Sequence, residues 1–373
     1  MGKLSFEQLV DLFLLLSVER IGPAKIRSLL SKFRNLHNIL DASINELQEV
    51  EGISKELSSR IKKISSHKDE MKSFVEKELT KLKKIGGRII TVWDEDYPPL
   101  LKKIYDPPLI LYLKGNFDER DQYSIAVVGT RSPTNYGKIQ AERIVTALAE
   151  QGITIVSGLA RGIDSIAHKT ALKNKSRTIA VVGSGLDVIY PPENKKLFEE
   201  ISENGVIISE FALGTKPDAV NFPKRNRIIS GISLGTLVVE TGINGGAMQT
   251  ARLALDQNRE VFAIPGNIGV RQSEGTNLLI QRGEAELITS AEDILTELEL
   301  KLKPVIGKNI PKPEKDLNMF EEKIYNSLTN EPLHIDKIAE LTNLSTSDCL
   351  VHLLSLEFKG LVKQLPGKVF GLI

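Results

Sequence analysis

The most basic stretch in the middle of the chain combines the residue types that hold single-stranded nucleic acid. Within NFPKRNRIISG (221–231), Lys224, Arg225 and Arg227 crowd together with Asn221, Phe222 and Asn226 among them. Arginine and lysine neutralise phosphates, and an aromatic ring stacks on an unpaired base. The alternative is a solvated, charged loop ahead of a helix or strand. Binding becomes the better interpretation because several glycine-bearing turns accompany this stretch.

These turns recur through the central part of the chain, and each offers backbone amides to a phosphate. They are GTRSPTNYG (129–137) with Arg131, SGLARGIDSIAH (157–168) with Arg161, GSGLDVIYPPENKKL (183–197) and ETGINGGAMQT (240–250). A helix that begins at such a turn adds a favourable dipole for an anion. Turns that follow parallel strands meet at one edge of the sheet. The pattern therefore predicts a phosphate-binding region.

Two common nucleotide-binding motifs do not fit these turns. Lys138 is followed by Ile139 instead of Ser or Thr, and Ser132 stands where a P-loop has its first glycine. GSG (183–185) is followed by Val188 at the third glycine position of the dinucleotide fingerprint. ATP hydrolysis and NAD chemistry therefore lose most of their support.

Groups able to do acid–base or metal chemistry are sparse. The histidines, at 37, 67, 168, 334 and 352, include no metal-spaced pair. Asp164 and His168 stand at i, i+4 on an expected helix, where they could form an acid–base pair or half a metal site. The alternative is a helix-start carboxylate with a structural hydrogen bond. Glu240 could be a base but lacks an evident partner, so we expect no catalytic residues, no metal and no cofactor.

Strands and helices that alternate between 123 and 300 must position these turns. Apolar, β-branched runs predict strands at 125–128, 153–156, 178–182, 206–208, 236–239 and 261–264. Apolar residues at helical spacing predict helices at 137–150, 162–173, 193–203, 246–257 and 275–283. Such alternation is typical of an α/β domain, here 84–300, with a mostly parallel sheet and helices on both faces.

Residues 1–83 form a predicted helical domain. Segments 18–33 and 48–64 resemble one another, each with an apolar residue, a glycine and then a helix. That is a helix-hairpin-helix repeat, in which a glycine turn can point amides at a phosphate. Pro23-Ala24 and Ile53-Ser54 occupy the place of the usual second glycine. A small helical packing module is therefore an equal alternative.

A connecting region follows at 86–122, with strands predicted at 88–93 and 109–113 around Pro-Pro turns. Trp93 and Tyr97 lie beside these prolines. Packing is the commoner fate of such aromatic residues, and stacking on bases is the rarer one. We expect both to pack.

Beyond the central domain, 301–316 holds prolines and lysines and is predicted to be an extended linker. Residues 317–373 predict a winged helix, with helices at 319–328, 334–341 and 346–358 and two short strands around Gly367. Its third helix has Asp348 and Glu357 and little positive charge. Base readout is therefore not expected, and a protein-docking or auxiliary role is at least as favoured.

Composition narrows the class of protein. The 373 residues suit two or three domains, and 49 basic against 48 acidic side chains leave a formal charge of +1. Any nucleic-acid site must then be a local patch. A single cysteine, Cys349, excludes an intramolecular disulfide and a cysteine-based zinc site. The N-terminal apolar run is interrupted by Glu7 and Asp11, so we expect no membrane association and a cytoplasmic protein.

The central domain as a whole resembles the DprA/Smf family of DNA-processing proteins. The resemblance is carried, in order, by VVGTRSPTNYG, SGLARGIDSIAH, GSGLDVIYPPEN, FPKRNRIISGIS, TLVVETGINGGAMQTARLALDQNREVFAIPG and SEGTNLLI. The upstream YPPLLKKIYDPPLILYLKG is similar too. The flanking helical domain and winged helix resemble the more variable end domains of that family.

The resemblance implies an extended Rossmann-like central domain and a non-catalytic, single-stranded DNA-binding protein of natural transformation and recombination. It further implies a homodimer that protects incoming DNA and helps to load the RecA recombinase. Carried over by motif, Arg131, Lys224, Arg225 and Arg227 should line the DNA pocket. Backbone amides should come from Gly129, Ser132, Gly158 and Gly183, with Arg161 and Lys195 as further candidates.

Two other functions stay open. The central domain is more distantly similar to nucleotide phosphoribohydrolases, since Gly235-Thr236 and Glu240 partly match their Pro-Gly-Gly-x-Gly-Thr-x-x-Glu segment. A transcription regulator acting through its winged helix is the other possibility. The apolar run Leu278–Ile280 could offer a partner or dimer face, although burial in the core is the commoner fate.

Overall fold

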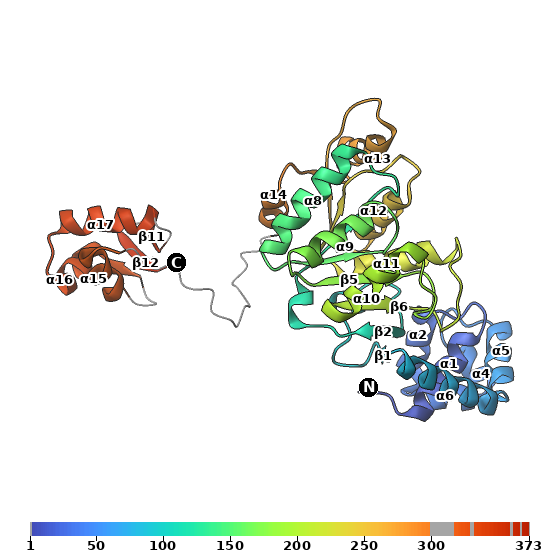
Figure 1. The fold of residues 1–373 in the computed structure, drawn as a ribbon. Helices are drawn as coiled ribbons and strands as arrows, with labels where there is room; N and C mark the ends of the chain where they lie inside the picture. The colour runs from blue at the N-terminus through green and yellow to red at the C-terminus, as the bar shows by residue number, and fades with distance from the viewer. Residues whose placement is uncertain (1, 299–316, 329–331, 359–360, 366–367, 373) are drawn as a thin grey trace. The chain divides into compact units, whose positions relative to one another are not determined.

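The computed structural model describes residues 2–298, 317–328, 332–358, 361–365 and 368–372. The chain divides into two compact units, residues 1–303 and 304–373 (Figure 1). The first holds a nine-stranded sheet and the helical module, and the second holds a three-stranded sheet with its own helices. The predicted linker 301–316 lies outside the described residues.

The large sheet has the strand order β1-β2-β6-β5-β4-β3-β7-β8-β9. Its parallel strands are β3 (Ser124–Val128), β4 (Thr154–Ser157), β5 (Thr178–Val182), β6 (Val206–Ser209), β7 (Gly235–Val238), β8 (Glu260–Ala263) and β9 (Glu286–Leu287). Ile125 pairs with Ile155 on one side and with Gly235 on the other. The strand order therefore reverses at β3, and the mostly parallel sheet is confirmed.

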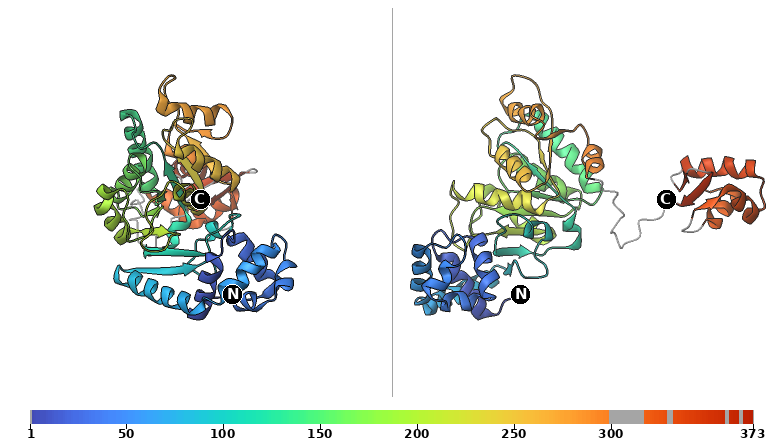
Figure 2. Two further views of the ribbon diagram at one scale, coloured as in Figure 1. Left: turned by 90° about the vertical axis from the view of Figure 1, so that its right-hand side faces the viewer. Right: turned by 180° about the vertical axis from the view of Figure 1, so that it is seen from behind.

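Helices cover both faces of this sheet, as predicted (Figures 1 and 2). One face packs against α8 (Asn135–Glu150), α9 (Ile163–Lys173) and α14 (Ala291–Glu297), and the other against α11 (Asn221–Ile232), α12 (Gly246–Asp256) and α13 (Arg271–Gln281). Successive side chains of a strand point to opposite faces. Ile125 and Val127 accordingly join the first layer, whereas Ala126 and Val128 join the second.

Both strands predicted within 86–122 are confirmed, and they join the large sheet, so this region is more than a connection. β1 (Gly87–Thr91) and β2 (Ile110–Gly115) pair antiparallel, and β2 pairs antiparallel with β6. An exposed edge of a sheet leaves amides and carbonyls without partners, and this hairpin satisfies those of β6. Between the strands lies the short helix α7 (Pro99–Lys102). Tyr97 is buried as expected, and its hydroxyl donates to the carbonyl of Pro108 at 2.7 Å.

The helix α11 and several short elements are absent from the helices and strands that hydrophobic periodicity predicts. The short ones include α7, β9 and α14, together with the single 3-10 turns Glu119–Gln122 and Pro192–Asn194. The helix α10 (Lys195–Asn204) was predicted and packs beside α9. In α13, Leu279 is buried and Leu278 and Ile280 are half-buried, so the core takes most of this apolar run.

The helical module contains α1 (Phe6–Ser17), α2 (Pro23–Phe33), α3 (Leu36–Asp41), α4 (Ile44–Gln48), α5 (Lys55–Ser65) and α6 (Lys68–Lys84). Its two hairpin turns repeat one hydrogen-bond pattern, because Ile21 N donates to Val18 O and Ile53 N donates to Val50 O, each at 3.1 Å. Both isoleucines are buried. The helices share one hydrophobic cluster with β1, β2 and the sheet, so the module is part of the first unit.

The second unit has the predicted winged-helix elements. They are α15 (Met319–Ser327), β10 (Leu333–His334), α16 (Ile335–Thr342), α17 (Thr346–Phe358), β11 (Val362–Leu365) and β12 (Val369–Leu372). Its own core includes Ile338, Leu353 and Phe370. The helix α17 exposes Leu350, Val351 and Leu354 by 41%, 66% and 54%. An apolar surface of this kind differs from the cationic or amide-bearing helix that reads a DNA groove.

Candidate nucleic-acid interface

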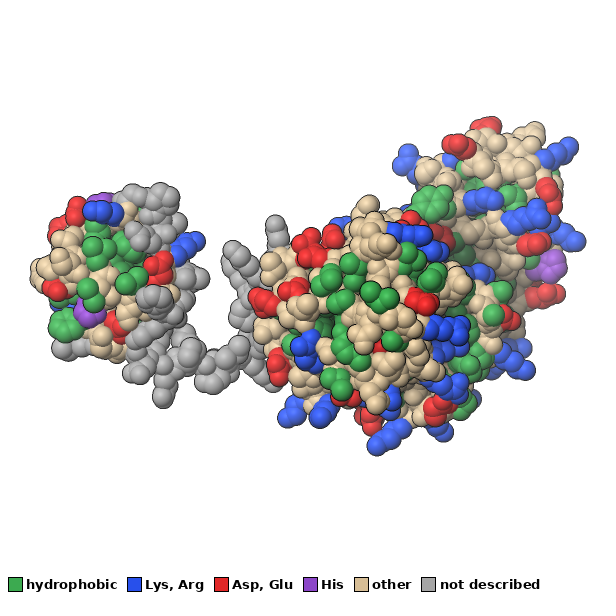
Figure 3. Space-filling view, turned by 90° about the horizontal axis from the view of Figure 1, so that it is seen from above, with side chains coloured by type: hydrophobic (Ala, Val, Ile, Leu, Met, Phe, Trp, Pro, Cys, Tyr) green, Lys and Arg blue, Asp and Glu red, His purple; other side chains and the backbone are tan. Residues whose placement is uncertain are grey.

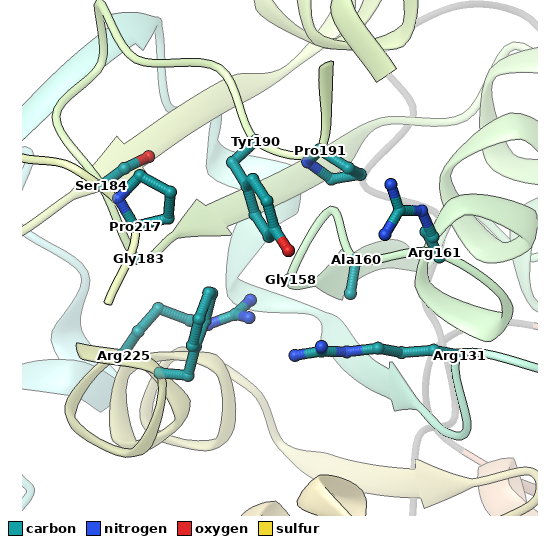
Figure 4. Close-up of a pocket in the computed structure, with 11 residues that line it drawn as sticks. Arg131, Gly158, Ala160, Arg161, Gly183, Ser184, Tyr190, Pro191, Pro217 and Arg225 are labelled. Carbon is teal, nitrogen blue, oxygen red and sulfur yellow. The ribbon is translucent and has the colours of Figure 1, made fainter. Parts of the chain in front are cut away.

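The turns after β3, β4 and β5 and the first turn of α11 enclose a pocket, which we call the arginine pocket (Figure 4). Its lining residues are Arg131, Gly158, Ala160, Arg161, Gly183, Ser184, Tyr190, Pro191, Pro217, Phe222 and Arg225. Parallel strands bring their carboxyl ends to one edge, so turns far apart in the sequence meet there. The predicted clustering of these turns is therefore observed.

The basic segment 221–231 is helical, and the alternative of a solvated charged loop is wrong. α11 spans Asn221–Ile232 and buries Ile228, Ile229 and Ile232 against the sheet. Pro223 is tolerated because it lies in the first turn, where no intrahelical amide bond is lost. The spacing of those isoleucines was the available sequence signal. The start of α11, with its positive dipole end, contributes directly to the pocket.

Arg225 is the buried cation of the arginine pocket, with 5% of its surface exposed. Its Nη1 donates to the carbonyl of Val181 at 2.8 Å, whereas its Nε has no hydrogen-bond partner among the described residues. Burial lowers its pKa to about 10; Asp164 opposes this shift and the nearby charge of Arg131 adds to it. The guanidinium therefore stays protonated near neutrality and retains an unused donor.

Arg131 and Phe222 complete the recognition surface. The guanidinium carbons of Arg131 and Arg225 lie 5.6 and 5.9 Å from the centre of the Phe222 ring. Tyr190 approaches the same ring, with centroids 6.1 Å apart. Arg131 is exposed and makes no hydrogen bond or ion pair to any described residue. Two like charges held beside aromatic rings favour an anion that carries a stackable group.

Two glycines permit the close approaches that shape the arginine pocket. A Cβ atom at Gly158 would lie 1.6 Å from Nη1 of Arg225, and one at Gly183 would lie 3.0 Å from the Phe222 ring. The amide of Gly158 donates to Asp164 Oδ2 at 3.2 Å, so it already has an acceptor. These positions need glycine because the arginine and the ring pass directly over the strand ends.

The other residues predicted to bind DNA have different surroundings. Arg161 lines the pocket but pairs with Glu193 at the surface. Arg227 is largely buried, with Nη1 on the carbonyl of Asp106 at 2.8 Å and Nη2 on the carboxylate of Glu210. Lys224 is exposed beside the pocket on α11. Arg225 and Phe222 are thus the members of the basic segment that line it.

The remaining candidates do not line the arginine pocket; they are Gly129, Ser132, Lys195, Asn221 and Asn226. Gly129 packs against Ile163, and the amide of Ser132 donates to Thr130 Oγ1 at 3.2 Å. Lys195 is exposed at the start of α10, whereas Asn221 and Asn226 are buried in α11. Their predicted contacts with DNA remain predictions.

Asp164 and His168 are buried and serve the fold separately. Asp164 Oδ2 accepts from the amides of Gly158 and Ala160, and burial raises its pKa while Arg225 opposes that shift. His168 Nδ1 lies 2.7 Å from Thr178 Oγ1, and that hydroxyl donates to Ile155 O. Nδ1 therefore carries the proton. His168 is turned to β5, away from Asp164. The structure therefore favours the alternative of a helix-start carboxylate with structural hydrogen bonds over an acid–base pair.

Glu240 is also held by the fold. Its carboxylate accepts from the amide of Thr134 at 2.9 Å and from the Thr134 hydroxyl, and it lies so close to Gly137 that a Cβ there would clash. This contact joins the segments that follow β3 and β7, the strands between which the strand order reverses and beside which ligands of open α/β sheets usually bind. The arginine pocket instead lies at the turns after β3, β4 and β5. The described residues contain no cluster able to hold a metal ion.

Several pocket residues were not predicted, namely Ala160, Ser184, Tyr190, Pro191 and Pro217. Pro217 lies in the segment between β6 and α11, for which periodicity gives no signal. Tyr190 could have been found from the sequence, because it is the aromatic residue of the glycine-bearing turn 183–197, which was itself predicted to bind phosphate. No helix of the described chain is both long and apolar enough to cross a bilayer.

Comparisons with known proteins agree with this architecture. Residues 88–299 match the model of the DNA recombination-mediator protein A family, residues 310–368 match the DprA winged helix domain, and residues 12–64 match a SAM-like helix-hairpin-helix tandem. Protein Smf of Synechocystis is 38% identical, with 94% of this chain and 95% of that protein aligned. The DNA processing protein DprA of Streptococcus pneumoniae is 44% identical over 56% of this chain and 73% of its own length.

Solved structures give the same assignment. The X-ray structure of DprA from Streptococcus pneumoniae matches 79% of this chain and 98% of its own, with a TM-score of 0.68 and 34% identity. A Helicobacter pylori DprA structure, described for its single-stranded DNA binding mode, matches 57% of this chain and 95% of its own, with a TM-score of 0.51 and 32% identity. The chain therefore belongs to the DNA recombination-mediator protein A (DprA/Smf) family.

Proposed function

We propose that this protein binds single-stranded DNA in the arginine pocket, protects DNA that enters during natural transformation and loads a RecA recombinase onto it. The observation that carries the binding part is the placement of Arg131 and Arg225 beside the ring of Phe222. Family membership and the described DNA binding of the Helicobacter pylori relative support it. RecA loading and a homodimer rest on the family alone.

The chemistry of the pocket suits an unpaired strand better than a duplex. Arg131 offers unused donors to a phosphate, and Phe222 and Tyr190 offer ring surface to a base. Every base has a π-face, so stacking tolerates sequence, while phosphate neutralisation makes affinity fall with salt. The pocket lining contains no carboxylate, and Asp164, His168 and Glu240 are engaged in the fold. These features support a binding role without catalysis over a phosphoribohydrolase.

The test is single-strand affinity, measured by fluorescence anisotropy at two salt concentrations for wild type and for Arg131→Ala with Lys224→Ala. We expect a loss of about 100-fold, since each lost charged contact is worth roughly tenfold or more. The slope of log K against log salt should fall by about 1.4 for two lost phosphate contacts. Lys77→Ala with Lys81→Ala removes the same charge from the exposed face of α6 and should change little.

Unchanged affinity in the Arg131/Lys224 variant would move the DNA site out of this pocket, and absence of any wild-type binding would reject the proposal. RecA loading has its own readout in the same samples. Wild type should speed assembly of RecA on DNA coated with single-strand-binding protein, and the pocket variant should not. Equal assembly with and without this protein would remove that part of the proposal.

A further inference from the structure

A second basic and aromatic pocket lies where the helical module meets the sheet. Its lining includes Arg27 and Leu30 of α2, Arg34 at the C-cap of that helix, Val92 and Trp93 just after β1, and Lys102 of α7. We call it the tryptophan pocket. All of these residues belong to the first unit. Within that unit, α2 and α6 pack into the same hydrophobic cluster as the large sheet.

The composition of this lining suits nucleic acid. Three cations line it and no carboxylate does. The side chains of Arg34 and Lys102 are exposed and make no hydrogen bond or ion pair within the described part of the chain, so their donors remain available. Trp93 is half-buried, so packing anchors the side chain while part of the indole borders the pocket. Unpaired cations beside an anchored aromatic ring are the elements of a stacking platform for an unpaired strand.

A short chain of contacts joins the two pockets. Lys224 and Arg227 stand three residues apart on α11 and share a side of that helix. Arg227 Nη1 donates to the carbonyl of Asp106 at 2.8 Å, and the carbonyl of the preceding Tyr105 accepts from Nη2 of Arg27. Tyr105 is 85% exposed. The loop at 105–106 therefore bridges α11, which forms part of the arginine pocket, and α2, which lines the tryptophan pocket.

We propose that a single DNA strand held in the arginine pocket continues past Lys224 and Tyr105 into the tryptophan pocket. There a base stacks on Trp93, and the phosphates beside it contact Arg34 and Lys102. This inference rests on the proposed function, and it gives the helical module a DNA contact through the C-terminal end of α2 instead of through its hairpin turns. Trp93, expected to pack, then both packs and binds.

Trp93 also provides the measurement, because it is the one tryptophan of the sequence. Full-length protein is titrated with thymidine homopolymers of about 6 to about 30 nucleotides, a range that brackets single-module footprints. Anisotropy reports binding to either pocket, whereas tryptophan fluorescence reports the tryptophan pocket. We expect short strands to bind without changing the fluorescence, and longer strands to quench it at saturation. A constant fluorescence at saturation with the longest strand would overturn the inference.

Variants distinguish a direct DNA contact in the tryptophan pocket from an indirect change in fluorescence. Arg34→Ala with Lys102→Ala should weaken binding of the longest strand about 100-fold, again roughly tenfold for each lost charged contact. The shortest strand should be unaffected, because each lost phosphate contact acts locally. Trp93→Phe should retain most of the affinity and Trp93→Ala should lose it for the longest strand only. Lys77→Ala with Lys81→Ala is the charge-matched control. Equal affinity of wild type and the Arg34/Lys102 variant at every length would reject the tryptophan pocket alone, whereas absence of binding at every length would reject the proposed function as well.

Discussion

At the scale of single residues, the buried His168 shows how the fold uses a titratable group without exposing it. It is fully buried, its Nδ1 donates to Thr178, and its Nε2 has no partner among the described residues. A bare nitrogen lone pair is tolerated there, whereas a second proton would be a buried donor without an acceptor. Burial, with a smaller contribution from Arg225, lowers the pKa of His168 to about 3.

This shift predicts acid sensitivity of the first unit. A histidine whose pKa is lower in the folded than in the unfolded chain stabilises the fold above its unfolded pKa, and that stability is lost as the pH falls towards the folded value. Between about pH 7 and about pH 5, wild type should lose about 2 kcal/mol of unfolding free energy through this group. Denaturant unfolding, followed by the fluorescence of Trp93, measures it.

The matched variant is His168→Asn, whose amide can occupy the position of Nδ1 without titrating. Its unfolding free energy should be lower than that of wild type near neutrality but should decline less on acidification. Parallel declines for the two proteins would show that His168 does not govern the acid response.

At the scale of elements, α11 presents its successive cations in different directions. Side chains about 100° apart around a helix cannot all face one pocket. Arg225 accordingly turns to the strand ends, whereas Lys224 and Arg227 share another side of the helix. There Lys224 is exposed to solvent, and Arg227 contacts the loop after α7 and Glu210. Burial raises the pKa of Glu210 and Arg227 opposes that shift, so the two charges depend on one another.

Arg227→Met should therefore destabilise the protein by about 2 to 3 kcal/mol, because it leaves the carboxylate of Glu210 largely buried and unpaired. Adding Glu210→Gln should recover a substantial part of that loss. Chemical denaturation of the single and double variants gives the stabilities, and anisotropy gives their DNA affinity. If Arg227 itself holds DNA, affinity should stay low in the double variant; if it anchors α11, affinity should return together with stability.

At the scale of the whole molecule, both pockets lie within residues 1–303. On the face shown in Figure 3, Lys and Arg side chains alternate with Asp and Glu, as the formal charge of +1 leads one to expect. Affinity must then come from local cations and not from a global field. The winged-helix unit has a separate core, and its α17 presents leucine and valine to solvent.

A protein truncated after Lys303 should therefore keep its affinity for short single strands within about twofold, since both pockets lie within the first unit and residues that share no partners act independently. The isolated residues 304–373 should show no specific duplex binding. Anisotropy with matched single- and double-stranded oligonucleotides checks both statements. A tenfold or greater loss in the truncated protein would show that the second unit contributes to the DNA site.

Sequence alone determined the class of fold and the neighbourhood of the site. Alternating buried strands and amphipathic helices admit few arrangements other than a parallel sheet between helical layers, and glycine turns after its strands then meet at one edge. The cations and the aromatic ring of 221–231 indicated Phe222 and Arg225, and the resemblance to the DprA/Smf family placed Arg131 and Arg225 in one expected DNA pocket. These predictions depend on local periodicity and chain order, which a sequence displays directly.

The tertiary structure decided which of those residues share a pocket. Arg225 and Arg227 stand in the same basic segment, and the sequence does not show which of them faces a pocket. In the structure, Arg225 lines the arginine pocket and Arg227 pairs with a carboxylate. The isoleucines that α11 buries set the rotation of the helix about its axis, and so the direction of each arginine. Glu240 is held by the amide of Thr134, 106 residues away. Trp93 and Arg34 line one pocket only because the C-terminal end of α2 lies near the segment that follows β1. Such long-range packing is fixed by the whole core, and no local pattern encodes it.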